Sequence, residues 1–147
     1  MRTLCVGMLV VGLVGLPAGI LRSQATPTAI HIVLPNEIQW QEDDPDFSHA
    51  DLLGNPGGSG LYMFRSKGRD GSILPPHWHP GDEHFTVISG TFLVGVGDKF
   101  DEQALQAIPT GAHAIIPANV HHFCKNRGET VIEIYGEGPF AKTDLRF

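Results

Sequence analysis

Cysteine is scarce in this sequence, which contains only two, Cys5 and Cys124. Cys5 lies in an N-terminal segment that we expect to be removed, so the mature chain would hold a single thiol. A single thiol can form no intramolecular disulfide, which excludes a fold stabilised by disulfide bonds. Cys124 falls in an apolar stretch and is predicted to be a small core residue, although its position would also let it face the interior near a bound metal.

Positive charge is also in short supply, with 10 Lys and Arg against 16 Asp and Glu and a formal net charge of −6. This balance excludes nucleic acid and anionic membrane surfaces as partners, because both attract basic proteins. The acidic residues concentrate in the segment 42–46, which we interpret as a solvated loop.

Helical periodicity is missing after residue 25, whereas Gly (18) and Pro (11) are frequent. Turn residues between short apolar runs favour an all-β sandwich or barrel. The length of 147 residues and the apolar content of 41% suit one domain, which we place at residues 26–147. The expected strands are Ile30–Leu34, Glu37–Gln41, His49–Leu53, Leu61–Ser66, Phe85–Ile88, Thr91–Val96, Ala112–Ile116, Val120–Lys125 and Thr130–Tyr135.

One turn and the C-terminal segment have specific predictions. Ser89-Gly90 is expected to be a tight turn that makes Phe85–Ile88 and Thr91–Val96 a hairpin. The last segment, Gly136–Phe147, is expected to leave the core as a tail. This tail would either pack across the rim or add an edge strand to a partner subunit.

The first residues have the pattern of a secretory signal peptide. Arg2 supplies a positive start, Leu4 to Leu21 carries no charge, and Ser23-Gln24-Ala25 is a small-x-small cleavage site. We therefore predict a signal peptide over residues 1–25 and an exported protein, periplasmic or extracellular. An uncleaved membrane anchor is the alternative, but the glycines and the proline in the apolar run disfavour a permanent membrane helix.

Three side chains able to bind a metal lie close together in the segment 71–90. In an extended chain, residues two positions apart share a face, so His77 and His79 project to the same side. Glu83 has the same parity, and the Pro80-Gly81-Asp82 corner can turn the chain without losing that side. Two imidazoles and a carboxylate suit iron, manganese, nickel, copper or zinc.

A fourth ligand is predicted downstream at His122. Pro117 and Asn119 mark a turn, and His122 lies in the apolar strand that follows it. Its neighbour His121 is the rival, because a register error of one residue would exchange the two side chains. His84 has the opposite parity to the ligands and should point away, while His113 would line the mouth or remain outside the site.

The two histidine-containing segments resemble the two motifs of the cupin superfamily. Gly71, His77, His79, Glu83 and Gly90 have the spacing of the first motif, and Gly111, Pro117, His122 and Asn126 have that of the second. Asn119 stands where the family usually has Gly, and Asn is the residue that best replaces Gly at positive φ. The resemblance implies a double-stranded β-helix, the jelly-roll barrel, with a divalent metal inside its mouth.

Family membership leaves the reaction open. Cupins include dioxygenases, isomerases, lyases, oxalate-degrading enzymes and pure binding or sensor domains, and some hold the metal with three histidines and leave the glutamate loose. The sequence is also similar to small bacterial cupins. The resemblance implies a homodimer, with Ile30–Gln41 as the segment best placed for strand exchange.

We expect an exported metal-binding cupin, a metal-dependent dioxygenase or related oxidoreductase acting on a small organic molecule. Glu83 is the carboxylate placed to act as general base. The alternatives are a non-catalytic module that binds a metal or a small ligand, and an isomerase or lyase that uses the metal as a Lewis acid.

Overall fold

The structure, a computed structural model, describes residues 29–145. The chain divides into two units, residues 1–32 and 33–147, and the second contains every strand described below. The expected signal peptide, residues 1–25, lies outside the described residues. Within those described, no helix has the length and apolar character needed to cross a membrane.

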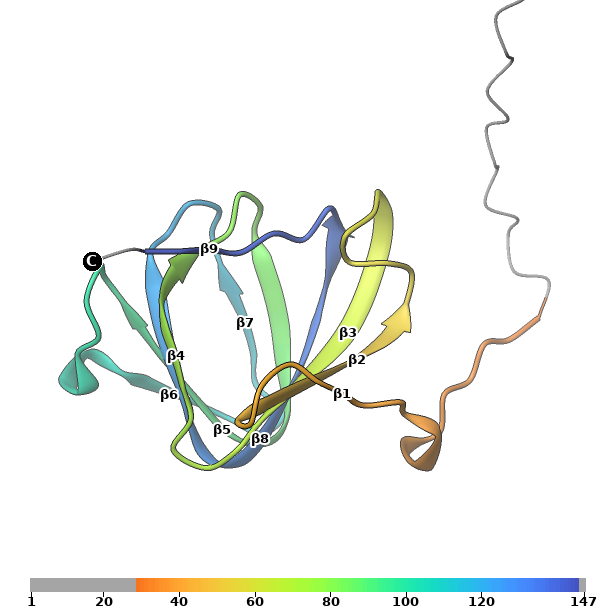
Figure 1. Ribbon diagram of the computed structural model, residues 1–147, viewed down its shortest axis with the longest axis horizontal. Helices are drawn as coiled ribbons and strands as arrows, with labels where there is room; N and C mark the ends of the chain where they lie inside the picture. The colour runs from red at the N-terminus through yellow and green to blue at the C-terminus, as the bar shows by residue number, and fades with distance from the viewer. Residues whose placement is uncertain (1–28, 146–147) are drawn as a thin grey trace, which may run out of the picture. The chain divides into compact units, whose positions relative to one another are not determined.

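The second unit is built almost entirely of antiparallel strands (Figure 1). Two short 3-10 helices, η1 (Pro35–Glu37) and η2 (Glu102–Ala104), lie between them. The strands are β1 (Gln41–Glu42), β2 (Phe47–Leu53), β3 (Gly60–Gly68), β4 (Ile73–Trp78), β5 (Glu83–Val96), β6 (Gln106–Pro109), β7 (His113–Ile116), β8 (His122–Gly138) and β9 (Thr143–Asp144). The expected all-β fold is therefore confirmed.

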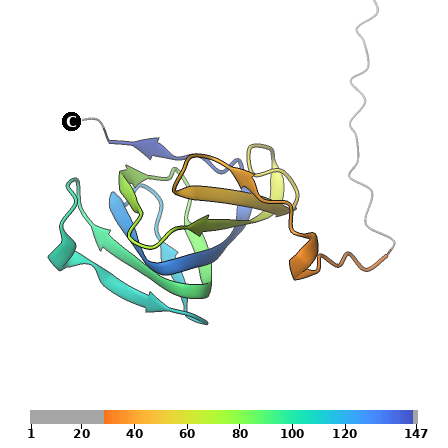
Figure 2. The same cartoon turned by 60° about the horizontal axis from the view of Figure 1, so that its bottom comes forward.

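The two longest strands, β5 and β8, hold the fold together by running through two sheets. The two strands pair antiparallel along most of their length, from His84 opposite Tyr135 to Val96 opposite His122. One sheet has the order β1-β2-β3-β8-β5-β7, and the other has the order β9-β4-β8-β5-β6. Figure 2 shows the two sheets curled toward each other, which is the arrangement of a jelly roll.

Alternating burial along the strands places one face of each sheet in the core. In β3, Tyr62 and Phe64 are buried while Leu61 is exposed. Phe85 and Val87 of β5 point to the same interior and are almost fully buried. Period-two alternation of this kind is what a strand with one face on a core requires.

The predicted hairpin at Ser89-Gly90 is wrong, because β5 continues through this position. The register with β8 shifts on either side of Ser89, and Gly90 has φ of 74°. A bulge therefore bends β5 from one sheet into the other, where a tight turn would have reversed it. An added Cβ at Gly90 would lie 2.5 Å from the Glu129 carbonyl oxygen, so glycine serves both the backbone angle and the close approach of β8.

The predicted strands Ile30–Leu34 and Glu37–Gln41 are also wrong. Pro35 begins the 3-10 helix η1, and the Glu37 carboxylate accepts a hydrogen bond from the Leu34 amide at 3.1 Å. Proline with a local carboxylate acceptor favours a turn over an extended edge strand. Strand exchange through this segment in a homodimer stays a prediction.

Candidate metal centre

Strand pairing brings the two histidine-containing motifs together. His77 on β4 lies directly opposite His122 on β8 in the antiparallel register. Residues directly opposite each other in an antiparallel pair share a face of the sheet, so both imidazoles point to the interior. His79 follows the end of β4, and Glu83 is the first residue of β5.

Two loops are tied to each other beside these residues. Asn119 has φ of 63°, as expected for a residue that replaces glycine at positive φ, and its amide donates to the His79 carbonyl at 2.8 Å. The Ala118 amide donates to the Asp82 carboxylate, also at 2.8 Å. The turn before His122 is thereby held against the corner between His79 and Glu83.

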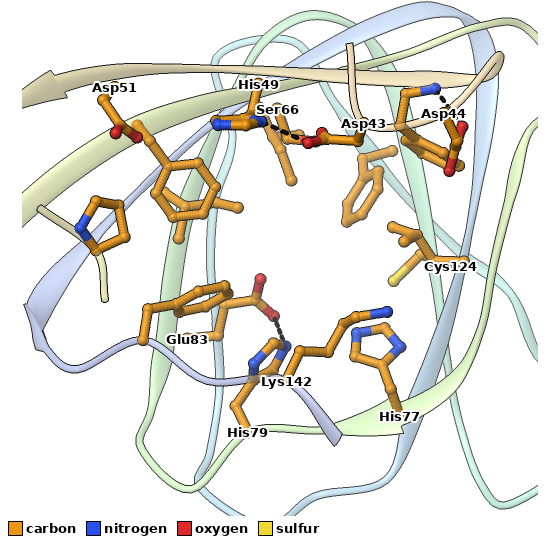
Figure 3. A pocket seen from close by; sticks show the side chains of 18 residues that line it. Asp43, Asp44, His49, Asp51, Ser66, His77, His79, Glu83, Cys124 and Lys142 are labelled. Atoms are coloured by element: carbon orange, nitrogen blue, oxygen red, sulfur yellow. Dashed lines mark hydrogen bonds and ion pairs between the residues drawn. The ribbon is translucent and has the colours of Figure 1, made fainter. Parts of the chain in front are cut away.

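The ligand atoms of the three histidines converge. One nitrogen from each of His77, His79 and His122 lies within 4.8 Å of the other two. Glu83 lies beside them, with its Oε2 atom 3.5 Å from Nε2 of His79 and 3.5 Å from Nε2 of His122 (Figure 3 shows the Glu83–His79 contact). All four side chains are buried, with exposed fractions from 0% for His122 to 8% for Glu83.

Backbone carbonyls determine which nitrogen of each imidazole carries the proton. His77, His79 and His122 each place Nδ1 at 2.7–2.9 Å from a carbonyl oxygen, those of Pro75, Ala141 and Val120 respectively. A carbonyl can only accept, so each Nδ1 donates and each Nε2 keeps its lone pair in the neutral ring. This is the outer arrangement that orients metal-binding histidines.

The free nitrogens fit a cation. Within residues 29–145, Nε2 of His79 and Nε2 of His122 are buried without a hydrogen-bond partner. Buried polar atoms are normally satisfied, so two unpartnered imidazole nitrogens that converge with a third are an arrangement that a metal ion fits. Burial lowers the pKa of His77 to about 4, an effect strengthened by His122 and His79 and opposed by the Pro75 carbonyl and Glu83, and so favours the neutral, lone-pair-bearing ring.

The four residues that the sequence singled out are thus brought together, while their roles as ligands stay predictions. The rival His121 points elsewhere, because its Nδ1 lies 2.7 Å from the Asp98 carboxylate and its side chain is 39% exposed. The converging set of three histidines with Glu83 to one side matches the three-histidine alternative as well as the four-ligand one.

The remaining predicted neighbours fall outside this cluster. His84 and His113 stack with Tyr135 at ring centroid distances of 5.8 Å and 5.9 Å and with each other at 6.1 Å. Neither histidine lines the cavity, so His113 is not at the mouth. Cys124 is buried and does face the cavity. Burial, and to a lesser extent Glu83, raise the pKa of the Cys124 thiol, which therefore stays protonated.

A cavity of about 470 Å³ opens beside the histidines and is large enough for a small organic molecule. Its inner walls are apolar, formed by Phe64, Leu74, Phe92, Ile132, Ile134 and Phe140. His77, His79 and Glu83 occupy one side of it, as Figure 3 shows.

The C-terminal segment supplies contacts that the sequence did not reveal. It runs along the upper ends of the strands in Figure 1, and β9 pairs with β4 at Trp78 and His77. The Phe140 ring stacks on the His79 ring at 4.8 Å, and the Ala141 carbonyl accepts the His79 Nδ1 bond. The tail was expected to begin at Gly136, but β8 continues through Gly138 and the tail begins after it. Its described part packs against β4 of the same chain, as the first of the two expectations has it.

Removal of residues 140–147 is expected to weaken metal binding by roughly 10–100-fold, because outer partners of ligating histidines have effects of this size. Without Phe140 and Ala141, the His79 ring loses both its stacking partner and its acceptor. Titration with Co²⁺, followed by its visible spectrum, would report both affinity and ligand arrangement. Thr143→Ala, at an exposed position of β9, is the control and should change neither. A truncated protein that is folded by circular dichroism and has the parent's Co²⁺ spectrum and affinity would contradict this role.

Comparison with known proteins agrees with the fold. The family model described as Cupin domain matches residues 69–135, which include both histidine-containing motifs. No curated protein sequence matches the chain. Several hundred solved structures do match it.

Three solved structures illustrate the range of these matches. A polyketide cyclase, RemF from Streptomyces resistomycificus, has a TM-score of 0.62 and 16% identity, covering 80% of this chain and 88% of that one. An RmlC-like cupin from Shewanella frigidimarina has a TM-score of 0.59 and 16% identity, covering 75% and 93%. Salicylate 1,2-dioxygenase from Pseudoaminobacter salicylatoxidans, in adducts with gentisate, has a TM-score of 0.57 and 15% identity, covering 69% of this chain but only 30% of that one.

Identities this low support a common fold and leave the substrate undecided. The family match, the jelly-roll topology and the agreement with known cupin structures rest on different observations. Taken together, they show that this chain belongs to the cupin superfamily.

Proposed function

We propose that this protein is an exported metal-dependent dioxygenase that acts on a small organic molecule bound in the cavity. The observation that carries the proposal is the set of three imidazoles whose ligand nitrogens converge beside a carboxylate, with His77, His79 and Glu83 lining an apolar cavity. Export rests on the apolar N-terminal run and its small-x-small site. The dioxygenase neighbour that binds gentisate supports the reaction class through its fold.

His77, His79 and His122 would hold the ion, with Glu83 as a fourth ligand or as a free carboxylate. A redox-active iron, manganese, nickel or copper ion supplies electron transfer with dioxygen, whereas zinc supplies Lewis acidity alone. The chain's own part is to keep three neutral imidazoles oriented and to bind the substrate between apolar walls that exclude water.

Glu83 would move the proton. Its Oε2 lies 3.5 Å from two imidazole nitrogens and faces the cavity, so a hydroxyl or an acidic C–H group of a bound substrate can come within its reach. The carboxylate would take that proton and hold it at Oε2 while the substrate is oxidised.

Oxygen uptake is the test of this function. Protein purified without a histidine tag would be assayed for metal by elemental analysis, loaded with Fe²⁺, and screened with a catechol, a diketone and a flavonol in an oxygen electrode. We expect uptake that depends on both metal and substrate. Tight ligand retention without uptake would instead identify a binding module, and conversion without uptake a Lewis-acid isomerase or lyase.

Glu83→Gln is expected to retain metal on the three histidines and to lower turnover by roughly 10²–10⁴-fold, the usual contribution of a general base. Glu137→Gln removes the same charge from an exposed position of β8 outside the cavity and should leave turnover unchanged. Full turnover in the Glu83 variant would remove this residue from the proton-transfer step.

A further inference from the structure

The cavity beside the histidines has two chemically different ends. Figure 3 shows His77, His79 and Glu83 on one side, with Asp43, Asp44, His49 and Asp51 across from them. Apolar side chains lie between the two ends. A molecule that reaches from the histidines toward the opposite side therefore meets carboxylates at its far end.

Within residues 29–145, no Lys or Arg side chain pairs with the carboxylates at this far end. Asp43 contacts His49 at 2.6 Å, and Asp44 accepts hydrogen bonds from the backbone amides of residues 46 and 47. The side-chain carboxylate of Asp51 makes no hydrogen bond or ion pair with any residue in the range 29–145. Among the described residues that line the cavity, Lys142 is the one ammonium or guanidinium group, and it pairs with Asp144 at 2.7 Å.

A second, independent feature indicates that the cavity with this acidic far end binds a ligand. The Nε2 atoms of His79 and His122 are buried without a partner among residues 29–145, and the His79 side chain, more than nine-tenths buried, lines the same cavity. The cavity thus has one end whose imidazole nitrogens fit a metal ion and another end whose carboxylates repel anions. Figure 3 shows Lys142 beside His77 and His79, so among the described lining residues no ammonium or guanidinium group lies with the carboxylates at the far end.

We propose, on the basis of the proposed function, that the substrate is a neutral or cationic apolar molecule whose far end carries no carboxylate, sulfonate or phosphate. The end of the substrate at the histidines can lose a proton, because a bound metal cation would balance the resulting negative charge. An acidic group at the other end of the substrate would face Asp43, Asp44 and Asp51. Like charges repel each other, and because these three carboxylates are exposed, the repulsion is strongest at low salt. Molecules with an acidic group at the end away from the histidines are therefore excluded.

The first experiment compares two catechols whose side chains have similar length and opposite charge, dopamine with its ammonium group and 3,4-dihydroxyphenylacetate with its carboxylate. Zn²⁺-loaded protein under argon prevents oxidation, and calorimetry gives both affinities. We expect dopamine to bind at least about tenfold more tightly at low salt, with a smaller ratio at high salt because exposed charges are screened.

The second experiment needs no metal. N-phenyl-1-naphthylamine and 8-anilino-1-naphthalenesulfonate share an apolar ring system and differ by one sulfonate. The neutral dye should bind metal-free protein and fluoresce. The sulfonated dye should bind at least about tenfold more weakly, because the carboxylates at the far end of the cavity repel its sulfonate. If the protein retains no metal, the proposed function fails, and this dye pair still decides the charge selectivity.

Asp51→Asn tests the origin of the selectivity. It removes one negative charge from the cavity at nearly constant shape, so the affinity ratio of the two catechols and that of the two dyes should both move closer to one. Glu137→Gln removes one charge outside the cavity and should leave both ratios unchanged. The proposal is overturned if the anionic member of either pair binds as tightly as its counterpart. It is also overturned if neither dye binds, or if the Asp51 and Glu137 variants behave alike.

Discussion

Replacing His122 with alanine is expected to abolish most metal binding, lowering affinity more than about 100-fold, because loss of an outer partner alone accounts for roughly 10–100-fold. The side chain is fully buried, its Nδ1 is held by the Val120 carbonyl, and its Nε2 faces the other two histidines. Elemental analysis and competition with a chelator would measure the loss.

The neighbouring His121→Ala is a matched control for this change. It removes the same ring one residue earlier, but His121 faces Asp98 and is partly exposed. We expect the parent's metal content in this variant. Retention of metal by the His122 variant, or its loss from the His121 variant alone, would show that the register assigned to β8 is wrong. Far-ultraviolet circular dichroism would verify that both variants fold.

Acidification is expected to destabilise the metal-free protein between about pH 6.5 and pH 4. His77 has a pKa lowered to about 4 in the folded chain, against an ordinary value of 6.5. Over that interval the unfolded state binds the extra proton, so the free energy of unfolding falls as pH falls. The difference corresponds to roughly 3 kcal/mol from this residue when the pH is below both values. Urea unfolding in the presence of a chelator, measured in steps from pH 7 to pH 4, would show it.

His77→Phe is the control for the acid effect, because it keeps a ring of similar size and cannot take a proton. Its stability should vary less across the same pH interval. The direct measurement is an NMR titration of the His77 ring in the folded metal-free protein. A ring that titrates near its ordinary pKa would refute the prediction, whatever the unfolding curves show.

The sequence contained most of the information needed to identify the metal-binding candidates, because their spacing follows from the geometry of a strand. Parity along an extended chain places His77, His79 and Glu83 on one side, and the structure keeps them there. Asn119 was expected at positive φ and has φ of 63°. Such features depend on neighbours close in sequence, which a local pattern records.

Predictions failed where the conformation depends on residues far apart in the chain. Ser89-Gly90 has the composition of a tight turn, but pairing of both halves of β5 with β8 makes it a bulge. Ile30–Leu34 is apolar enough for a strand, yet no strand is assigned there among the described residues, and the turn at Pro35 follows directly. Strand propensity alone cannot supply a pairing partner.

The residues that surround the histidines show most clearly which features follow from the sequence and which follow from the tertiary structure. The amino-acid sequence alone determined the fold family, the converging imidazoles and the choice of His122 over His121, since these depend on local spacing and alternation. Only the tertiary structure decided that Phe140 and Ala141 support His79 and that Asp43 and Asp51 face the histidines across an apolar cavity. Those contacts join segments distant in sequence, and the energy of packing them exists only once the two sheets have closed.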